Sequence, residues 1–269
     1  MTVQCSLIIS TYNWPAALEL CLQSIMKQHV LPNEIIIADD GSTAETQELI
    51  ASYQQKSLVP LVHVWHEDNG FRLTQIRNKA VAKAQFPYII QIDGDVMLHP
   101  AFIGDHLAIA QTENIVTGSR VNCDKAFSQD ILVSGILPSL RAIQFNSTNY
   151  FNSLHIPMFS AIFANHYKTK GRHRDFTRGC NMAYWKRDFI AVNGYNEDMT
   201  GWGSEDKELF ARMIQRGCRK KFLKFAGIVY HIWHYSASKE KEIRNESIYR
   251  KTVDLNITFI PNGIDKYLN

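Results

Sequence analysis

Two acidic residues separated by one glycine, Asp93 and Asp95, directly follow an apolar run at residues 88–92. Two carboxylates this close at the end of a buried strand repel each other, and a bound cation would compensate their charge. Hard oxygen ligands of this kind hold Mg²⁺ or Mn²⁺ and leave other coordination positions for phosphate oxygens. Gly94 lets the backbone come close to a ligand. An Asp-Gly-Asp tripeptide alone is more typical of a turn, but its position after a strand favours a metal site.

A second acidic cluster, Asp39-Asp40-Gly41-Ser42, also ends an apolar run. Gly41 and Ser42 suit a turn followed by a helix cap, so part of this motif has a structural explanation. That explanation leaves the Asp40 carboxylate free to accept a hydrogen bond from a nucleobase N–H. Tyr12, at the end of the first strand, offers a flat ring on which a base can stack.

The most specific motif is Gly-Trp-Gly-Ser-Glu-Asp at residues 201–206. Acidic residues are favoured in the first turn of a helix by its dipole, which explains Glu205 and Asp206 as well as a chemical role does. Trp202 between two glycines is harder to explain structurally. An indole suits the apolar face of a sugar, and a carboxylate beside it can act as a general base.

Two histidines, His231 and His234, end a β-rich run. A single histidine is usually structural, but a pair at the end of a strand, in a chain that also has an Asp-Gly-Asp motif, is a candidate metal ligand set. We expect His231 to be the third ligand, and His234 is an additional candidate.

The elements that must position these residues alternate along the first half of the chain. Apolar runs at residues 4–10, 34–38, 61–65 and 88–92 predict strands, and the patterns at 15–28, 44–55 and 74–84 predict helices. This alternation is typical of βαβ units in an α/β fold with a mostly parallel sheet. Ligands bind beyond the carboxyl ends of such strands, so the polar residues found there are expected to line one cleft.

The second half is less regular. We predict a helix at 204–215, strands at 221–225 and 228–233, and a polar helix at 238–253, whereas residues 122–175 contain no recognisable motif. A soft boundary near residues 118–122 leaves open whether this half extends the first sheet. The aromatic and basic stretch at 145–174 is either a loop packed on the core or a contact with a membrane that carries a lipid-linked acceptor.

Composition excludes several classes of protein. The 269 residues carry a formal charge of +3, with Lys and Arg spread along the chain, which argues against nucleic acid binding. The five cysteines are scattered without a C-x-x-C pair, as expected for free thiols in a reducing compartment. The N-terminus shows no signal peptide pattern, and no apolar stretch is long enough to cross a membrane. We therefore expect a cytoplasmic protein, either soluble or peripheral at the inner face of a membrane.

Seven features occur in a fixed order along the chain. They are Ser-Thr-Tyr-Asn at 10–13, Asp-Asp-Gly-Ser at 39–42, Asp-Asn-Gly-Phe-Arg at 68–72 continuing to Arg77-Asn78, Asp-Gly-Asp at 93–95, Arg-Gly-Cys-Asn at 178–181, the motif at 201–206, and His231. As an ordered set they resemble the inverting family 2 glycosyltransferases with the GT-A fold. The similarity is strongest to the subgroup whose C-terminal part looks like β-1,4-galactosyltransferases and bacterial chondroitin polymerase.

The resemblance implies a role for individual residues. For the nucleotide, it implies Tyr12 and Asp40 at the uracil, Ser10 or Thr11 assisting, Arg77 on the donor, and Asp93 with Gly94 near the ribose or the metal. For Mn²⁺ or Mg²⁺, it implies Asp95 and His231, with Asp93 and His234 as further candidates. For the sugars, it implies Asp206 as the catalytic base, Glu205 on the acceptor, and Trp202, Gly203, Asn181 and Arg178 around the donor and acceptor.

The implied reaction is transfer of a hexose or N-acetylhexosamine from a UDP-sugar to a saccharide hydroxyl, with inversion, in bacterial surface polysaccharide or lipopolysaccharide synthesis. Residues 1–121 would form the nucleotide-sugar-binding half and residues 122–269 the acceptor-binding and catalytic half of one continuous domain. Two alternatives remain open: a nucleotidyltransferase acting on a sugar phosphate, and a non-catalytic carbohydrate-binding homologue. A dinucleotide-binding dehydrogenase is disfavoured, because the first strand is not followed by G-x-G-x-x-G.

Overall fold

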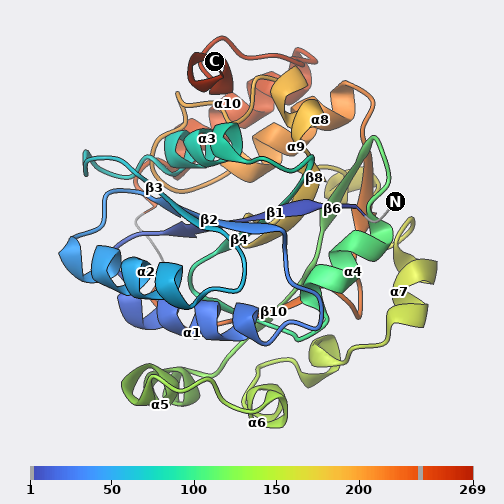
Figure 1. Cartoon of the computed structure of the whole chain (residues 1–269). Coiled ribbons are helices and arrows are strands. Elements are labelled where there is room, and N and C mark those ends of the chain that lie inside the picture. The colour runs from blue at the N-terminus through green and yellow to red at the C-terminus, as the bar shows by residue number, and fades with distance from the viewer. Residues whose placement is uncertain (1–2, 236–238, 269) are drawn as a thin grey trace.

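The computed structural model of the chain describes residues 3–235 and 239–268 (Figure 1). The strands are β1 (Cys5–Thr11), β2 (Glu34–Asp39), β3 (Leu61–Trp65), β4 (Tyr88–Asp93), β5 (Val96–Leu98), β6 (Asn114–Thr117), β7 (Ser119–Asn122), β8 (Asn181–Trp185), β9 (Arg219–Phe222) and β10 (Ile228–His231). The α-helices are α1 (Pro15–Met26), α2 (Ala44–Lys56), α3 (Leu73–Lys83), α4 (Phe102–Ile109), α5 (Lys125–Ser134), α6 (Leu140–Phe145), α7 (Pro157–Phe163), α8 (Lys186–Ala191), α9 (Glu205–Gln215) and α10 (Glu242–Asp254). Three short 3₁₀ helices are η1 (Tyr150–Ser153), η2 (Gly171–His173) and η3 (Ile264–Tyr267).

A seven-stranded sheet in the order β3-β2-β1-β4-β8-β6-β9 forms the centre of the molecule. The first four strands are parallel, β8 is antiparallel to both of its neighbours, and β6 and β9 are parallel to each other. The predicted α/β class with a mostly parallel sheet is confirmed. Strands from both halves of the sequence therefore share one sheet.

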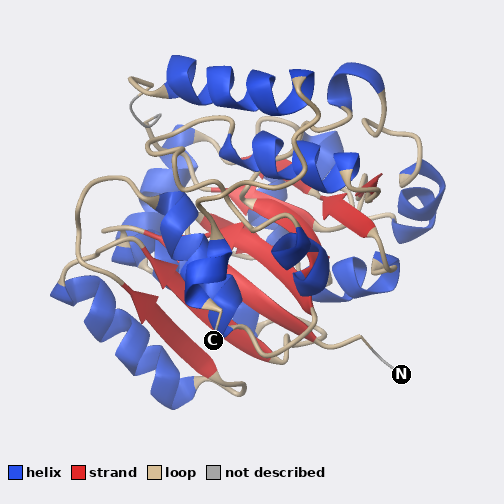
Figure 2. Cartoon of the chain, turned by 90° about the horizontal axis from the view of Figure 1, so that it is seen from above, coloured by secondary structure: helices blue, strands red, loops and turns tan. Residues whose placement is uncertain are grey.

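Helices cover both faces of this sheet: Figure 1 shows the two helical layers with the sheet between them, and Figure 2 looks onto one face, with helices in front of the strands. Successive residues of a strand point to opposite faces. Leu7 and Ile9 accordingly pack with α1 and α2, whereas Ile8 packs with α3, α8 and α9. A fully buried Leu or Ile contributes about 2 kcal/mol, so burial on both faces fixes these strands firmly. Their polar carboxyl ends are held on a rigid base.

A smaller sheet in the order β5-β10-β7 lies beside the large one. Strand β10 pairs antiparallel with β5 and parallel with β7, and this pairing sets His231 opposite Val96. The backbone N–H of Ile232 donates to the carbonyl of Asp95 at 2.9 Å. The small sheet thus carries a histidine from late in the sequence to the residue that follows the end of β4.

Differences from the predicted elements lie mainly at their ends. The strand predicted at 228–233 ends at His231, and the one predicted at 221–225 is β9, displaced toward the N-terminus. The helix predicted at 238–253 is α10, which begins at Glu242, and its predicted first residue, 238, lies outside the described residues. Residues 122–175, which showed no motif, form the short helices α5, α6 and α7 with two 3₁₀ turns.

The two sheets are joined through the buried side chain of Asn181 on β8. Its Nδ2 donates to the carbonyl oxygens of Ser119 and Gly227, at 2.9 and 2.6 Å, and its Oδ1 lies 3.0 Å from Nε2 of His106. A Cβ atom on Gly118 would lie 2.3 Å from this amide, so glycine is required there. Every polar atom of the Asn181 side chain is used inside the protein.

We predict that Asn181→Ala lowers the free energy of unfolding by about 3 kcal/mol, because two carbonyls lose their buried donor. Urea denaturation measures this change, and Asn165→Ala, at an exposed position, serves as the control. Equal stability of the two variants would contradict the structural role of Asn181.

Candidate active site

A cleft of about 830 Å³ opens beyond the carboxyl ends of β1, β2 and β4 and receives residues from both halves of the chain. Most of the residues singled out in the sequence line it. They are Ser10, Thr11, Tyr12, Asp40, Arg77, Asp93, Asp95, Arg178, Trp202, Gly203, Glu205, Asp206, His231 and His234. The structure thus brings together residues that lie up to about two hundred positions apart in the sequence.

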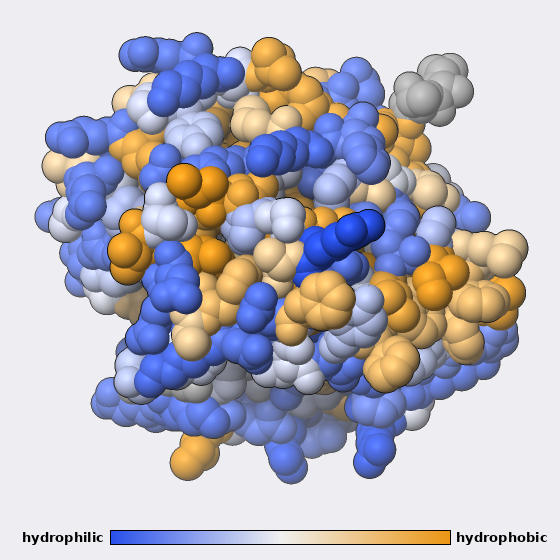
Figure 3. Space-filling view, turned by 90° about the horizontal axis from the view of Figure 1, so that it is seen from below, coloured by the Kyte–Doolittle hydropathy of each residue, from blue (hydrophilic) through white to orange (hydrophobic). Residues whose placement is uncertain are grey.

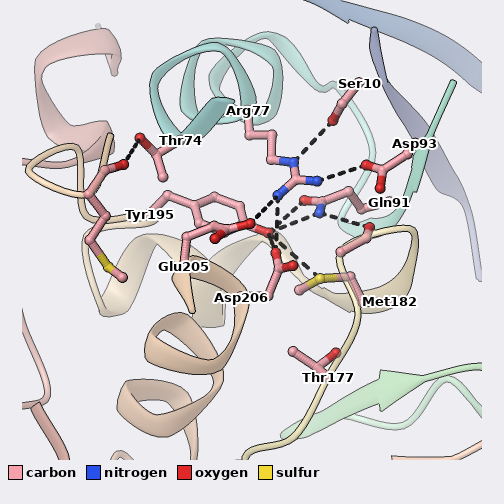
Figure 4. Close-up of polar contacts among 12 residues, drawn as sticks. Ser10, Thr74, Arg77, Gln91, Asp93, Thr177, Met182, Tyr195, Glu205 and Asp206 are labelled. Atoms are coloured by element: carbon pink, nitrogen blue, oxygen red, sulfur yellow. Dashed lines mark hydrogen bonds and ion pairs between the residues drawn. The ribbon is translucent and has the colours of Figure 1, made fainter. Parts of the chain in front are cut away.

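The guanidinium of Arg77, on α3, connects three elements of the cleft (Figure 4). Its Nε donates to Ser10 Oγ at 3.0 Å, its Nη2 to Asp93 Oδ1 at 2.8 Å, and its Nη1 to Asp206 Oδ1 at 3.0 Å. Glu205 Oε1 lies 4.0 Å from Nη1. Burial works against the charge of Arg77, but its negative neighbours outweigh burial and hold its pKa well above the usual value. One buried cation therefore balances a group of acids.

Asp206 is held through one of its two carboxylate oxygens. Oδ1 accepts from Arg77 and also from the hydroxyl of Tyr195, at 2.9 Å, and Tyr195 is in turn fixed by Gln91. Among the described residues, Oδ2 has no hydrogen-bond donor. A Cβ on Gly179 would lie 2.4 Å from Oδ2, so the absence of a side chain there leaves this oxygen room. The arrangement leaves one fixed carboxylate oxygen able to accept a proton from a molecule in the cleft.

The loop before α9 turns sharply to present Trp202, which is 40% exposed, to the cleft. Gly201, Gly203 and Ser204 all have positive φ angles, of 76°, 117° and 64°. Glycine adopts such angles without strain, which explains the two glycines around the indole. The N–H of Gly203 donates to Glu205 Oε2 at 3.0 Å, so the loop and the first turn of α9 are held together.

Two acids of the cleft are shifted toward the protonated form. Burial raises the pKa of Glu205 to about 7, with the charge of Asp206 adding to the shift and Arg77 opposing it. Burial also raises the pKa of Asp93 to about 6, where Arg77 opposes the shift and Asp95 adds to it. Perturbed acids gathered in one cleft are typical of functional sites.

A candidate metal centre is formed by Asp95, His231 and His234, whose ligand atoms all lie within 4.8 Å of one another. Oδ2 of Asp95 is 3.5 Å from His231 Nε2 and 3.1 Å from His234 Nε2, and its Oδ1 is buried without a hydrogen-bond partner among the described residues. An unsatisfied buried carboxylate oxygen beside two imidazoles fits a divalent cation. Asp93 lies outside this set, and its Oδ1 accepts from Arg77.

The protonation of these groups follows from their contacts. Burial works against ionisation of Asp95, but the hydrogen bond from His234 and the nearby His231 outweigh it and lower its pKa. Burial lowers the pKa of His231, which favours the neutral imidazole that a metal requires. The hydrogen bond to Asp95 raises the pKa of His234.

At the other end of the cleft, Tyr12 is half exposed and its hydroxyl donates to Asp68 Oδ2 at 2.8 Å. Asp40 is not free, in contrast to the interpretation from its sequence. Its Oδ1 lies 2.7 Å from His66 Nε2, and its Oδ2 accepts from the backbone N–H of Arg72 at 2.9 Å. Each oxygen keeps a second lone pair, and these contacts orient the carboxylate within the cleft wall.

Two predicted site residues do not line the cleft. Asn181, expected to contact a sugar, is fully buried with its amide bonded to backbone and His106, so the structure does not support that expectation. Gly94 packs against β1, where its N–H donates to the Ser10 carbonyl at 2.7 Å and a Cβ would lie 3.1 Å from that oxygen. The close approach that Gly94 permits is therefore to the neighbouring strand.

The sequence patterns missed several residues that shape the cleft, among them the buried Tyr195 and the cleft-lining Arg120. Tyr195, which orients Asp206, stands in no motif, and its buried position next to Arg77 depends on the tertiary structure. Arg120 lies within the soft boundary at residues 118–122 and lines the cleft together with Arg178. Its Nε is buried with no partner among the described residues. The two arginines add positive charge to the cleft near His231.

The fold and the cleft define an α/β enzyme of the GT-A type, and comparison with known proteins identifies the family. Residues 6–180 match the family described as glycosyl transferase family 2, and residues 159–235 match one described as the N-terminal domain of galactosyltransferase. Because the first match covers well over half of the chain, the protein belongs to glycosyltransferase family 2. The resemblance seen in the motifs is confirmed.

Individual relatives extend this comparison. The chain is 28% identical over 222 residues to validoxylamine A glucosyltransferase of Streptomyces hygroscopicus subsp. limoneus, covering 79% of this chain and 48% of that protein. It is 23% identical over 248 residues to Escherichia coli chondroitin synthase, covering 84% of this chain and 34% of that protein. The chain thus spans about half or less of these relatives. The crystal structure of S. aureus TarS 1-349 in complex with UDP-GlcNAc has a TM-score of 0.64 at 17% identity, covering 99% of this chain and 70% of that one, and shows the same fold.

We predict that Glu205→Gln stabilises the protein at high pH. Folding raises the pKa of Glu205 from the ordinary 4.5 to about 7, so ionised Glu205 lowers the stability of the fold as the pH rises through this window. The variant should be more stable than the wild type by about 2 kcal/mol at pH 8 and nearly equal near pH 5. Urea unfolding at both pH values measures the difference. A difference in unfolding free energy that does not change with pH would contradict a raised pKa at Glu205.

Proposed function

We propose that the chain transfers a hexose or N-acetylhexosamine from a UDP-sugar to a saccharide hydroxyl, with inversion at the anomeric carbon. The observation that carries this proposal is the position of Asp206. One of its oxygens is fixed by Arg77 and Tyr195, while the other has no donor among the described residues and belongs to the cleft that also contains the Asp95 cluster. A base and a cation site that face one cleft are what a single displacement on a nucleotide sugar requires.

The donor is proposed to lie along the wall formed by β1, β2 and β4. Tyr12 offers an exposed ring for the uracil, and the oriented carboxylate of Asp40 lies beside it as an acceptor. Arg120 and Arg178 supply positive charge for the diphosphate. The solved structures of S. aureus TarS with UDP and with UDP-GlcNAc support a UDP-sugar as the donor class.

The metal proposed for this site is Mn²⁺ in preference to Mg²⁺. Mg²⁺ is held mainly by oxygen ligands and water, whereas Asp95, His231 and His234 offer one carboxylate and two imidazoles. A cation held by these residues would supply charge neutralisation for the departing diphosphate. The protein contributes the fixed Asp95 carboxylate and the neutral imidazole of His231.

Catalysis is proposed to depend on Asp206 as general base, which takes the proton of the attacking acceptor hydroxyl at Oδ2. Glu205, whose raised pKa keeps it partly protonated near neutral pH, is proposed to hydrogen-bond the acceptor. The exposed indole of Trp202 is suited to the apolar face of a sugar. Displacement on one face of the anomeric carbon inverts its configuration.

The alternatives raised by the sequence are answered differently. The reaction of a nucleotidyltransferase does not require an indole beside a carboxylate, as found at Trp202. Membership of glycosyltransferase family 2 supports sugar transfer instead. A non-catalytic carbohydrate-binding protein needs no oriented base, so release of UDP from UDP-sugars in the presence of Mn²⁺ separates it from an enzyme.

Bacterial surface polysaccharide or lipopolysaccharide synthesis is the proposed setting, and the E. coli chondroitin synthase relative supports polysaccharide as the product class.

Replacement of Asp206 by Asn tests the proposed base directly. We predict a loss in turnover of about 10²- to 10⁴-fold, because the amide cannot accept the proton, with UDP affinity nearly unchanged. UDP release assays and calorimetric titration with UDP measure the two quantities. Asp254→Asn, at an exposed position on α10, is the matched control, and normal turnover in Asp206→Asn would remove Asp206 from this role.

Replacement of Asp95 by Ala tests the metal centre. The variant should bind UDP at least about tenfold more weakly than the wild type when Mn²⁺ is present, because the cation loses its carboxylate ligand. Affinity for UDP in the presence of EDTA should be the same for both proteins. An unchanged Mn²⁺-dependent titration would place the cation elsewhere.

A further inference from the structure

Large apolar side chains lie on the outside of the segment that runs from α6 to α7. They are Phe145, Tyr150, Phe151, Met158, Phe159, Ile162 and Phe163, and together they are called the α6–α7 surface below. Phe145, Phe151 and Met158 are each more than 70% exposed. Within this set the ring of Tyr150 contacts those of Phe145 and Phe151, and exposed apolar groups gathered in this way mark an interaction site in a folded protein.

Helix α7 buries its small side chains and exposes its large apolar ones, the reverse of an ordinary surface helix. Its buried side is made of the small residues Ser160 and, just past its end, Ala164, whereas Met158 and Ile162 are 71% and 62% exposed. An ordinary surface helix buries its large apolar residues and exposes its polar ones. Helix α7 therefore presents its apolar face to the outside of the molecule.

This segment is firmly attached to the rest of the molecule. His155 Nε2 lies 3.0 Å from both carboxylate oxygens of Asp105 on α4, and the N–H of Ile156 donates to the Phe225 carbonyl at 2.8 Å. The rings of Phe145 and Tyr150 stack with centroids 5.7 Å apart. The apolar groups thus form a preformed surface.

The charges of the segment favour one kind of partner. Residues 131–174 contain no Asp or Glu, but they contain five basic residues: Arg141, Lys168, Lys170, Arg172 and Arg174. Arg141, Lys170, Arg172 and Arg174 are exposed, and Lys168 is partly buried. Two copies of the chain packed through this segment would bring like charges together. An anionic surface that also accepts apolar side chains fits better.

Figure 3 shows the face on which α5 and α6 lie, with apolar side chains gathered toward its right side, where α7 is found, and hydrophilic groups interspersed. Aromatic side chains flanked by Lys and Arg are typical of proteins that rest on a bilayer, because the rings enter the headgroup boundary and the cations meet anionic lipid. No helix of the described residues is long and apolar enough to cross a membrane, so such contact would be peripheral.

We propose that the α6–α7 surface docks the protein on a bilayer containing anionic lipid. Thr148, which lines the cleft, lies between Phe145 and Tyr150 in the sequence. Docking through these residues places one edge of the cleft at the headgroups. On the proposed function, this position suits a saccharide acceptor carried on a lipid.

The test is sedimentation of the wild-type protein with vesicles, without donor or acceptor. We expect binding to phosphatidylcholine vesicles that contain about one third phosphatidylglycerol, weaker binding in high salt, and little binding to phosphatidylcholine alone. The variant Phe145→Ser/Phe151→Ser/Met158→Ser/Ile162→Ser should bind at least about tenfold less. The control Leu58→Ser/Ile243→Ser/Leu255→Ser, which changes exposed apolar residues elsewhere, should bind like the wild type.

Three outcomes would overturn the proposal. They are absence of binding to anionic vesicles, equal loss in the surface variant and the control, and a dimer in solution that the surface variant dissociates while no vesicles bind. Circular dichroism and UDP release in the absence of vesicles should be unchanged in the surface variant. Because vesicle binding is measured without turnover, its failure is distinguishable from a failure of the proposed transferase activity.

Discussion

The buried guanidinium of Arg77 is the interaction on which the cleft depends. It lies 1% exposed among three carboxylates, those of Asp93, Glu205 and Asp206, which come from two distant parts of the chain. Removing one partner of a buried charge cluster commonly costs several kcal/mol because the remaining charges are left without compensation. The same contacts that hold β4 and α9 together also fix Asp206 in one orientation. The Arg77 side chain therefore both stabilises the fold and orients the proposed catalytic base.

Several parts of this arrangement could be predicted from the sequence, because they depend on local patterns. Strands buried on both faces appear as continuous apolar runs, and their polar ends predict where a cleft opens. The glycines around Trp202 and the acids after them mark the start of α9. Predictions that depend on contacts between distant elements were less successful. Asn181 follows Arg-Gly-Cys in a motif, but its side chain points into the junction of the two sheets.

The partners of the site residues could not be predicted either. Tyr195 and Arg120 stand in no pattern, and both matter only because the chain folds back onto the end of the first sheet. Asp40 was expected to be free, whereas His66 and the backbone of Arg72 hold it. Spacing in a sequence reports which residues share an element, but contacts between elements depend on the topology. The small sheet that brings His231 to Asp95 is the clearest example, since its three strands come from widely separated segments.

The measurement that tests this account most directly is a crystal structure with Mn²⁺ and UDP, with the cation located by its anomalous scattering. The account predicts one strong peak bound by Asp95 and His231 and by the diphosphate, with the uracil beside Tyr12 and Asp40 and with Asp206 on the open side of the same cleft. A cation bound away from Asp95, or UDP bound outside this cleft, would contradict it.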